Sequence, residues 1–586
     1  MTMMSVAIPE WWPLSTVATF IVTIITAYAV TYQLSTRKLD PREPTVVASP
    51  IPYVGHILGM VLLGGRYVKN IGIRHRHLPI FTLPVPNSRI YIVTDPSLAA
   101  AVQRASKALS FTPVIPEATE RVLGLDAETM KIVRKNLDPG PGDERSFLAD
   151  IQDMVYAWLG PGSYLTELTL DAARELQSEV ATFAASIDAG TGDSRVAAPP
   201  RDLLVWIRHF VTAATAKYLY GPQNPIALDP GLEEAFWNFD HGLGMLLMGM
   251  FPSVTAHQAY AGRERLAGAI ARYLESGRHE MAGASRIIQE RVRIALRHGW
   301  TLRAAARSEL SFLFAGIVNM TTTTFWIVLQ IFADPALLAT VREEVGLVLK
   351  PADKEDEDEE EHNTIGNDGR SGVRTKYRLN VADLRERCPM LVAVYRECLR
   401  LGSDNYSTRV VKEDTLLAGR YFLRKDAVVQ IAGGVIHADP SIWGDDAGEF
   451  NPGRFLPKNN NSNGNGGDDT GQRPGAVAGA GRQNQGIHPA AFRAFGGGKT
   501  LCPGRHFAMS EILSFVALVV LHFDIEGVPP DGGSSSSGKK RIRVPRKNDG
   551  VLPVHILEPV TSVMVRIVRR REGPTKGDLL DVRFEM

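Results

Sequence analysis

The segment FGGGKTLCPGRHFA, which spans Phe495 to Ala508, restricts the possible folds of this chain more than any other feature. Its three consecutive glycines permit a tight backbone turn, and a helical stretch is expected to begin just past Cys502. A helix N-terminus stabilises a thiolate through free N–H groups and its dipole, and Pro503 fits an early helical position where no N–H is needed. The segment predicts a buried thiolate ligand, although a glycine-rich hairpin with a core cysteine would leave the same pattern.

The overall composition is that of a globular protein without a strong electrostatic bias. Of 586 residues, 44% are hydrophobic, and 65 basic against 64 acidic side chains leave a formal net charge of +1. Such a charge provides no global field for attracting nucleic acid, so no nucleic-acid partner is predicted. Cys388, Cys398 and Cys502 form no C-x-x-C pair, and their odd number favours a reducing compartment over a disulfide scaffold.

Two further motifs lie upstream of the cysteine segment. Glu397 and Arg400 stand three residues apart in a helical pattern and therefore share one helix face. By itself, such a pair is usually a surface ion pair that contributes about 0.3 kcal/mol. A second segment, FNPGRF at Phe450 to Phe455, places Arg454 between this pair and the cysteine along the chain. The three motifs in this order are more specific than any one of them.

Together the three motifs resemble the signature of the cytochrome P-450 family. Its string F-x-x-G-x-R-x-C-x-G is matched by Phe495, Gly498, Cys502 and Gly504. The resemblance implies a mainly α fold with a minor β part, the cytochrome P-450 fold, and a haem whose iron takes Cys502 as axial ligand. Thiolate donation favours O–O cleavage, which is why oxygen-activating haem enzymes use cysteine.

The resemblance also assigns roles to three arginines. Arg400 belongs to the family's E-x-x-R motif with Glu397, and Arg454 is expected to bury against that pair. Arg409 resembles the arginine that reaches a haem propionate, with a surface arginine at a strand edge as the alternative. Thr500 stands where the family usually has a second propionate-binding arginine, so that salt bridge must be replaced or lost.

The helix expected to cross the distal face of the haem is LSFLFAGIVNMTTTTFWIVLQIFADP, Leu310 to Pro335. Ala315 and Gly316 fit the small-residue step that makes room for oxygen and substrate. The customary acid and threonine positions hold Val318 and Asn319, and valine cannot transfer a proton. Proton delivery would then need Asn319, water or a hydroxyl of residues 321–324, although these threonines are also typical of helix packing or back-bonding.

These departures narrow the resemblance to one branch of the family. Asparagine at the threonine position, a following Phe-Trp pair and Thr500 resemble the branch of cholesterol 7α-hydroxylase, sterol 12α-hydroxylase and prostacyclin synthase. The resemblance covers most of the chain from about Pro50. Asn-rich and acidic inserts are typical of a fungal member. In this family the region of GLGMLLMGMF, Gly242 to Phe251, caps the substrate channel and can dip into the membrane; a buried helix is the alternative.

The N-terminus predicts a membrane anchor. Residues 11–36 carry no charged side chain and are long enough for one transmembrane helix. Arg37, Lys38 and Arg42 follow this stretch and only Glu10 precedes it, so the rest of the chain is predicted to be cytosolic. A cleaved signal peptide is the alternative, but the first ten residues lack its basic charge.

The remaining chain reads as one domain. A proline-rich linker is expected at 37–52, and a catalytic domain at 53–586 with low-complexity inserts near 354–372, 458–486 and 531–540. Apolar spacing predicts helices over 200–220, 256–276 and 310–332. Short strands are expected late in the chain, at 409–411, 421–422 and 427–431.

The leading functional hypothesis is a monooxygenase that hydroxylates or epoxidises an apolar sterol, terpenoid or other secondary metabolite with O2. No flavin segment, G-x-G-x-x-G after a strand or iron–sulfur cysteine set occurs, so another protein must reduce the haem. The resemblance implies that this partner is an NADPH-dependent P-450 reductase on the same endoplasmic reticulum membrane. An isomerase or dehydratase that acts on a peroxide is the second hypothesis. A non-catalytic haem or sterol binder is the third.

Overall fold

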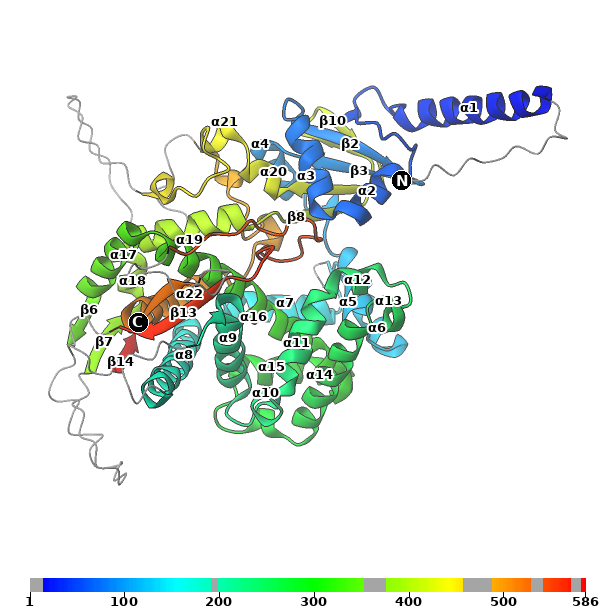
Figure 1. Ribbon diagram of the computed structural model, residues 1–586. Helices are drawn as coiled ribbons and strands as arrows, with labels where there is room; N and C mark the ends of the chain where they lie inside the picture. The colour runs from blue at the N-terminus through cyan, green and yellow to red at the C-terminus, as the bar shows by residue number, and fades with distance from the viewer. Residues whose placement is uncertain are drawn as a thin grey trace, which may run out of the picture.

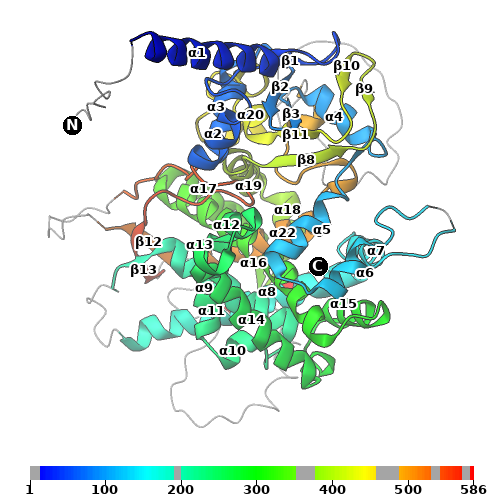
Figure 2. The same ribbon diagram turned by 90° about the vertical axis from the view of Figure 1, so that its right-hand side faces the viewer.

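The computed structural model describes residues 14–140, 142–190, 199–351, 376–456, 487–528, 541–570 and 581–586 (Figure 1). The predicted inserts at 354–372, 458–486 and 531–540 lie outside these residues. The fold is mainly helical with a minor β part, as predicted. Figures 1 and 2 show the largest sheet at one end of the molecule and the longest helices packed together at the other.

The largest sheet joins the N-terminal part of the chain to segments near residue 430. Its strand order is β1 (Thr45–Val46), β2 (Ile80–Val85), β3 (Ser88–Val93), β11 (Val428–Ala432), β8 (Tyr406–Val411) and β4 (Leu109–Ser110). The β2–β3 hairpin was not expected, because Pro84 and Pro86 interrupt the strand pattern. Strand β1 lies within the predicted linker at 37–52 and pairs in parallel with β2.

The smaller sheets lie at the edges of the helical part. They are formed by β12 (Phe523–Gly527), β13 (Met564–Arg569) and β5 (Arg201–Asp202); by β14 (Asp581–Glu585), β7 (Lys376–Asn380) and β6 (Leu349–Pro351); and by β9 (Thr415–Leu417) with β10 (Tyr421–Leu423).

Helix α16 (Leu302–Ala333) is the central element of the helical part. Its N-cap is Thr301, whose hydroxyl accepts from the N–H of Ala304 at 3.1 Å. It packs against α9 (Leu203–Tyr220), α14 (His257–Glu275), α19 (Pro389–Gly402) and α22 (Arg505–His522). Because neighbours surround it, its apolar residues follow no single stripe, as expected of a core helix.

The other helices complete the body. They are α3 (Gly65–Arg74), α4 (Pro96–Arg104), α5 (Val114–Leu123), α6 (Ala127–Arg134), α7 (Phe147–Trp158), α8 (Ser163–Gly190), α10 (Pro225–Leu228), α11 (Gly231–His241), α15 (Arg286–Arg297), α17 (Pro335–Val348), α18 (Val381–Arg387), α20 (Gly433–His437) and α21 (Pro440–Trp443).

Helix α1 (Leu14–Thr36) lies outside the folded body (Figure 1). Among the described residues, three helices are long and apolar enough to cross a membrane, but α16 and α22 are largely buried, whereas only 6% of the apolar window of α1 is. This exposure is what a membrane-spanning helix requires. Apolar side chains are also exposed on α2 (Gly55–Leu63) and around α12 (Leu243–Met248) and α13 (Pro252–Thr255).

Candidate active site

The loop from Phe495 to Cys502 is closed by its own backbone. The N–H of Cys502 donates to the carbonyl of Phe495 at 2.9 Å. Gly496 and Gly498 have φ values of 72° and 62°, in the left-handed region that favours glycine. Helix α22 begins at Arg505, with Gly504 as its N-cap, so Pro503 lies just before the helix and not within its first turn.

Cys502 sits where its sulfur meets backbone donors. Burial raises the pKa of the Cys502 thiol, while the backbone N–H groups of Gly504 and Arg505 and the charge of Arg505 act in the opposite direction. A cation bound at Sγ would add to these donors and favour the thiolate. Cys388 and Cys398 are buried free thiols whose pKa burial also raises, and no backbone donor opposes that shift.

Two arginines approach each other beside this loop. Arg409, on β8, donates from Nη2 to the Thr500 hydroxyl at 2.6 Å. Arg493 is only 1% exposed and donates to the hydroxyl of Ser407 at 3.2 Å, but its Nε has no partner. Burial and the charge of Arg409 lower the pKa of Arg493 to about 10. Among the described residues, neither guanidinium has a carboxylate partner, so the pair leaves a buried positive charge without compensation.

The motif pair of α19 and the arginine of η3 (Pro452–Phe455) form one buried cluster. Glu397 and Arg400 are both fully buried and make a two-pronged ion pair at 2.7 and 2.8 Å. Arg454 donates from Nε to Glu397 Oε1 at 3.0 Å. Arg400 also donates to the backbone carbonyls of His437 and Ala447. The cluster ties α19 to the segment that precedes the cysteine loop.

One face of α16 is open. Ser311, Ala315 and Asn319 follow one another at four-residue spacing and are exposed, although most of the helix is buried. Gly316 does not share this face: a Cβ there would lie 3.4 Å from Thr215 of α9. Ala315 therefore lines the open face, whereas the small size of Gly316 allows α9 to pack closely. Val318 is fully buried.

Asn319 and Trp326 bind one backbone segment. Asn319 Oδ1 accepts from the N–H of Ile556 at 2.9 Å, and Trp326 Nε1 donates to the carbonyl of Leu557 at 2.8 Å. The two side chains are seven residues apart and so lie on one face of α16. While its oxygen accepts from Ile556, the Asn319 NH2 group supplies two N–H donors that a ligand can use.

The four threonines that follow Asn319 are buried inside α16. Thr322 donates to the carbonyl of Val318 at 3.2 Å, which is the back-bonding expected of threonine in a helix. Thr324 contacts the sulfur of Met320 at 3.9 Å. These contacts agree with a packing role.

Comparison with known proteins of similar sequence shows the family to which this chain belongs. A sequence model described as Cytochrome P450 matches residues 275–552. The cytochrome P450 monooxygenase nodJ of Hypoxylon pulicicidum is 30% identical over 547 residues, which cover 93% of each chain. The chain belongs to the cytochrome P450 family. A cytochrome P450 monooxygenase of Gibberella zeae is 27% identical over 84% of this chain and 83% of its own. Cholesterol 7-alpha-monooxygenase of Cricetulus griseus is 27% identical over 50% of this P450 and 52% of its own length.

Membership of the P450 family implies a haem cofactor, and three observations fit that group. A cysteine sulfur faces backbone donors at the start of α22. The Arg409–Arg493 pair lacks a protein carboxylate and can accept the anionic propionates of haem. The exposed face of α16 leaves access for a ligand. The sequence offered no signal for Arg493, which belongs to no motif string.

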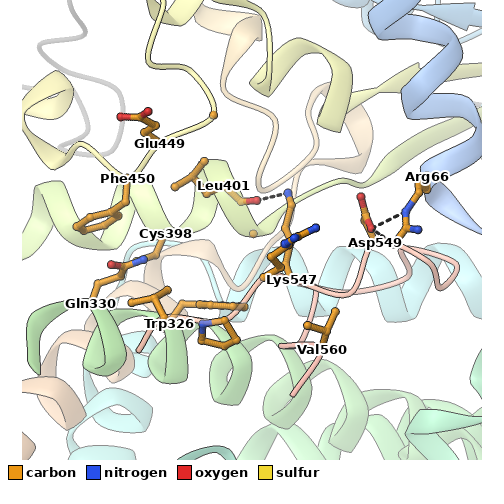
Figure 3. Close-up of a pocket in the computed structure, with 15 residues that line it drawn as sticks. Arg66, Trp326, Gln330, Cys398, Leu401, Glu449, Phe450, Lys547, Asp549 and Val560 are labelled. Atoms are coloured by element: carbon orange, nitrogen blue, oxygen red, sulfur yellow. Dashed lines mark hydrogen bonds and ion pairs between the residues drawn. The ribbon is translucent and has the colours of Figure 1, made fainter. Parts of the chain in front are cut away.

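A separate cavity of about 1110 Å³ lies between α16, α19 and residues 544–560 of this P450 (Figure 3). Trp326, Gln330 and Cys398 line it, and Lys547 crosses it to reach the carbonyl of Leu401. Arg66 pairs with Asp549 at 2.6 Å on its far side. None of the predicted site residues lines this cavity.

Proposed function

We propose that this P450 inserts one oxygen atom from O2 into an apolar sterol, terpenoid or comparable secondary metabolite in a biosynthetic pathway. The observation that carries the proposal is the closed cysteine loop at the start of α22. Relatives over most of the chain are named as P450 monooxygenases, and a shorter match is named as acting on cholesterol. The exposed apolar surface around α2 and α12 supports a substrate that enters from a membrane.

In this proposal Cys502 would hold the haem iron, and Phe495, Gly498 and Gly504 would shape the loop that presents the cysteine. Arg409 and Arg493 would hold the propionates. Arg493 would take the role of the arginine that the family usually has at the position of Thr500. When bound, haem supplies the oxygen-activating chemistry. The N–H groups of Gly504 and Arg505 stabilise charge on Sγ, and Ala315 leaves room on the open face of α16.

The role of Cys502 is tested by the spectrum of the reduced carbonyl complex. Cys502→Ala should abolish the thiolate-type spectrum, because no other described cysteine has donors at its sulfur. Cys398→Ala, which removes a buried thiol from α19, is the matched control and should retain it. A thiolate-type spectrum in Cys502→Ala would end the proposal.

The role of Arg493 is tested by haem retention. Arg493→Leu should lower haem affinity roughly ten- to hundredfold, since a charge-assisted hydrogen bond contributes roughly 1.5–3 kcal/mol. Thr500→Arg should restore much of that loss, because it returns a guanidinium to the position the family uses. The exposed Arg104→Leu is the control. Unchanged haem content in Arg493→Leu would remove this residue from the haem site.

We propose that electrons come from NADPH through a separate P450 reductase, and that α1 anchors the enzyme in the endoplasmic reticulum with its catalytic domain in the cytosol. Arg37, Lys38 and Arg42 immediately after α1 support this orientation. Protease treatment of sealed microsomes should degrade the catalytic domain without detergent. Protection of the domain would reverse the orientation.

Isomerisation or dehydration of a peroxide is the second candidate. The buried Val318 and the engaged oxygen of Asn319 favour it, because neither side chain can relay a proton. Metabolites of the native host with and without this gene separate the two candidates by mass spectrometry. An accumulated compound lighter than the lost product by oxygen supports the monooxygenase, whereas two isomers support rearrangement.

A further inference from the structure

A buried acidic group lies behind the backbone segment that Asn319 contacts. Asp240, near the end of α11, has a fully buried side chain, and neither carboxylate oxygen has a hydrogen-bond partner in the described part of the chain. Its nearest basic partner at ion-pair distance is His555, whose Nε2 lies 3.6 Å from Oδ1. A carboxyl group without hydrogen-bond partners is costly to bury, so the contact with His555 is expected to offset part of that cost.

His555 connects Asp240 to the backbone next to Asn319. Its Nδ1 lies 2.8 Å from the carbonyl of Ile556. A carbonyl can only accept, so Nδ1 carries the proton and Nε2 is left to face Asp240. The ring also packs edge-on against Phe314 of α16, with centroids 6.4 Å apart. The N–H of Ile556 then donates to Asn319 Oδ1 at 2.9 Å.

The groups around Asp240 argue against a metal ion at this place. Asp240, His241 and Glu558 bring their ligand atoms within 4.8 Å of one another. Arg208 of α9, however, donates to His241 Nε2 at 2.8 Å and also to Glu558. The Arg208 guanidinium thus occupies the position that a metal ion would take between His241 and Glu558. His555 is then the basic side chain that faces Asp240.

We propose that Asp240 is a positioning residue that acts through His555 and Ile556 to hold the Asn319 side chain with its NH2 group toward the open face of α16. This inference rests on the proposed function, because that face is where a ligand is expected. It assigns Asn319 as a fixed hydrogen-bond donor in the distal region. Burial raises the pKa of the Asp240 carboxyl, which favours its neutral form next to His555.

The test uses the full-length enzyme and the infrared C–O stretch of its reduced carbonyl complex, which reports on hydrogen-bond donors near the bound ligand. Asn319→Leu should move this band. Asp240→Leu should move it to the same position, and the double variant should show no further shift. Asp240→Asn, which keeps a neutral polar group of the same shape next to His555, should leave the band close to that of the unmodified enzyme.

Two further variants keep the outcome decisive. His555→Phe preserves a ring against Phe314 and replaces Asp240→Leu in the test if that variant does not fold. It should move the band to the position seen in Asn319→Leu. His241→Leu changes a neighbouring residue that contacts Arg208 and Glu558, and it should leave the band unchanged. A band that stays in place in Asp240→Leu and His555→Phe, with the thiolate-type spectrum intact, would overturn this inference alone. Absence of that spectrum from the unmodified enzyme would overturn the proposed function.

Discussion

At the scale of the residue, Glu511 is the clearest case of a charge state set by burial. It lies on α22, is 2% exposed, and one carboxylate oxygen has no hydrogen-bond partner in the described part of the chain. Burial raises its pKa to about 8, and the nearby Tyr218 opposes the shift. The folded enzyme therefore keeps a proton that the unfolded chain releases near its ordinary pKa of 4.5.

This difference predicts a pH-dependent gain from Glu511→Gln. Between pH 4.5 and 8 the unfolded state binds fewer protons than the folded state, so the free energy of unfolding falls as pH rises. Glu511→Gln removes this penalty, on the order of 4 kcal/mol, and should raise the denaturation midpoint by about 3–4 °C at pH 8. At pH 4.5 it should change little. The exposed Glu343→Gln of α17 is the control, and an equal gain at both pH values would contradict the assignment.

At the scale of the element, the Glu397–Arg400–Arg454 cluster holds α19 against η3. The side chains of Glu397 and Arg400 are fully buried, so each depends on the other for compensation of its charge. Arg454 adds a second cation at 3.0 Å from the same carboxylate. The contact therefore behaves as one unit.

We predict strong coupling within this unit. Glu397→Leu should cost about 3–5 kcal/mol, because it leaves two buried guanidinium groups without their carboxylate. The double variant Glu397→Leu/Arg400→Leu should cost less than the sum of the two single changes. Denaturant titration of the three variants measures this coupling. Additive losses would show that the side chains do not depend on one another.

Helix α16 illustrates how one element combines two tasks. Asn319 and Trp326 bind the consecutive residues Ile556 and Leu557, whereas Ala315 leaves the neighbouring turn open. The asparagine and the tryptophan that resemble one branch of the family thus have a structural explanation. They attach the segment near residue 556 to the helix.

At the scale of the whole molecule, the apolar surface extends beyond α1. Leu62 of α2 is 77% exposed, and Phe251 and Val254 are 80% and 78% exposed. Gly64, just after α2, and Gly244 of α12 both lie against the loop of residues 550–552, so the two patches are neighbours. Such an exposed patch is typical of a surface that contacts a membrane.

We predict two-step membrane release. Removal of residues 1–34 should leave the fold intact, since α1 contributes little to the core, but part of the enzyme should still sediment with vesicles. Adding Leu62→Asp and Phe251→Asp to the truncated chain should release it, because charges at an apolar interface oppose insertion. Arg104→Asp, on an exposed position of α4, is the matched charge control. Complete release by truncation alone would show that the patch does not bind membrane.

The sequence by itself determined the family, the mainly helical fold, the apolar N-terminal helix and the segment that carries Cys502. These features depend on local patterns: glycines where φ is positive, an uncharged stretch of membrane length, and motif strings in a set order. The β2–β3 hairpin and strand β1 were not predicted from the sequence, because short strands interrupted by proline leave a weak local pattern.

Only the tertiary structure decided which residues meet. Arg493 lies outside every motif string, yet folding buries it beside Arg409 with no carboxylate to pair with. Gly316 faces α9 and Asn319 holds Ile556, which stands 237 residues away in the chain. Contacts between such distant positions arise from packing, because each depends on helix rotation and close approach that no single segment encodes.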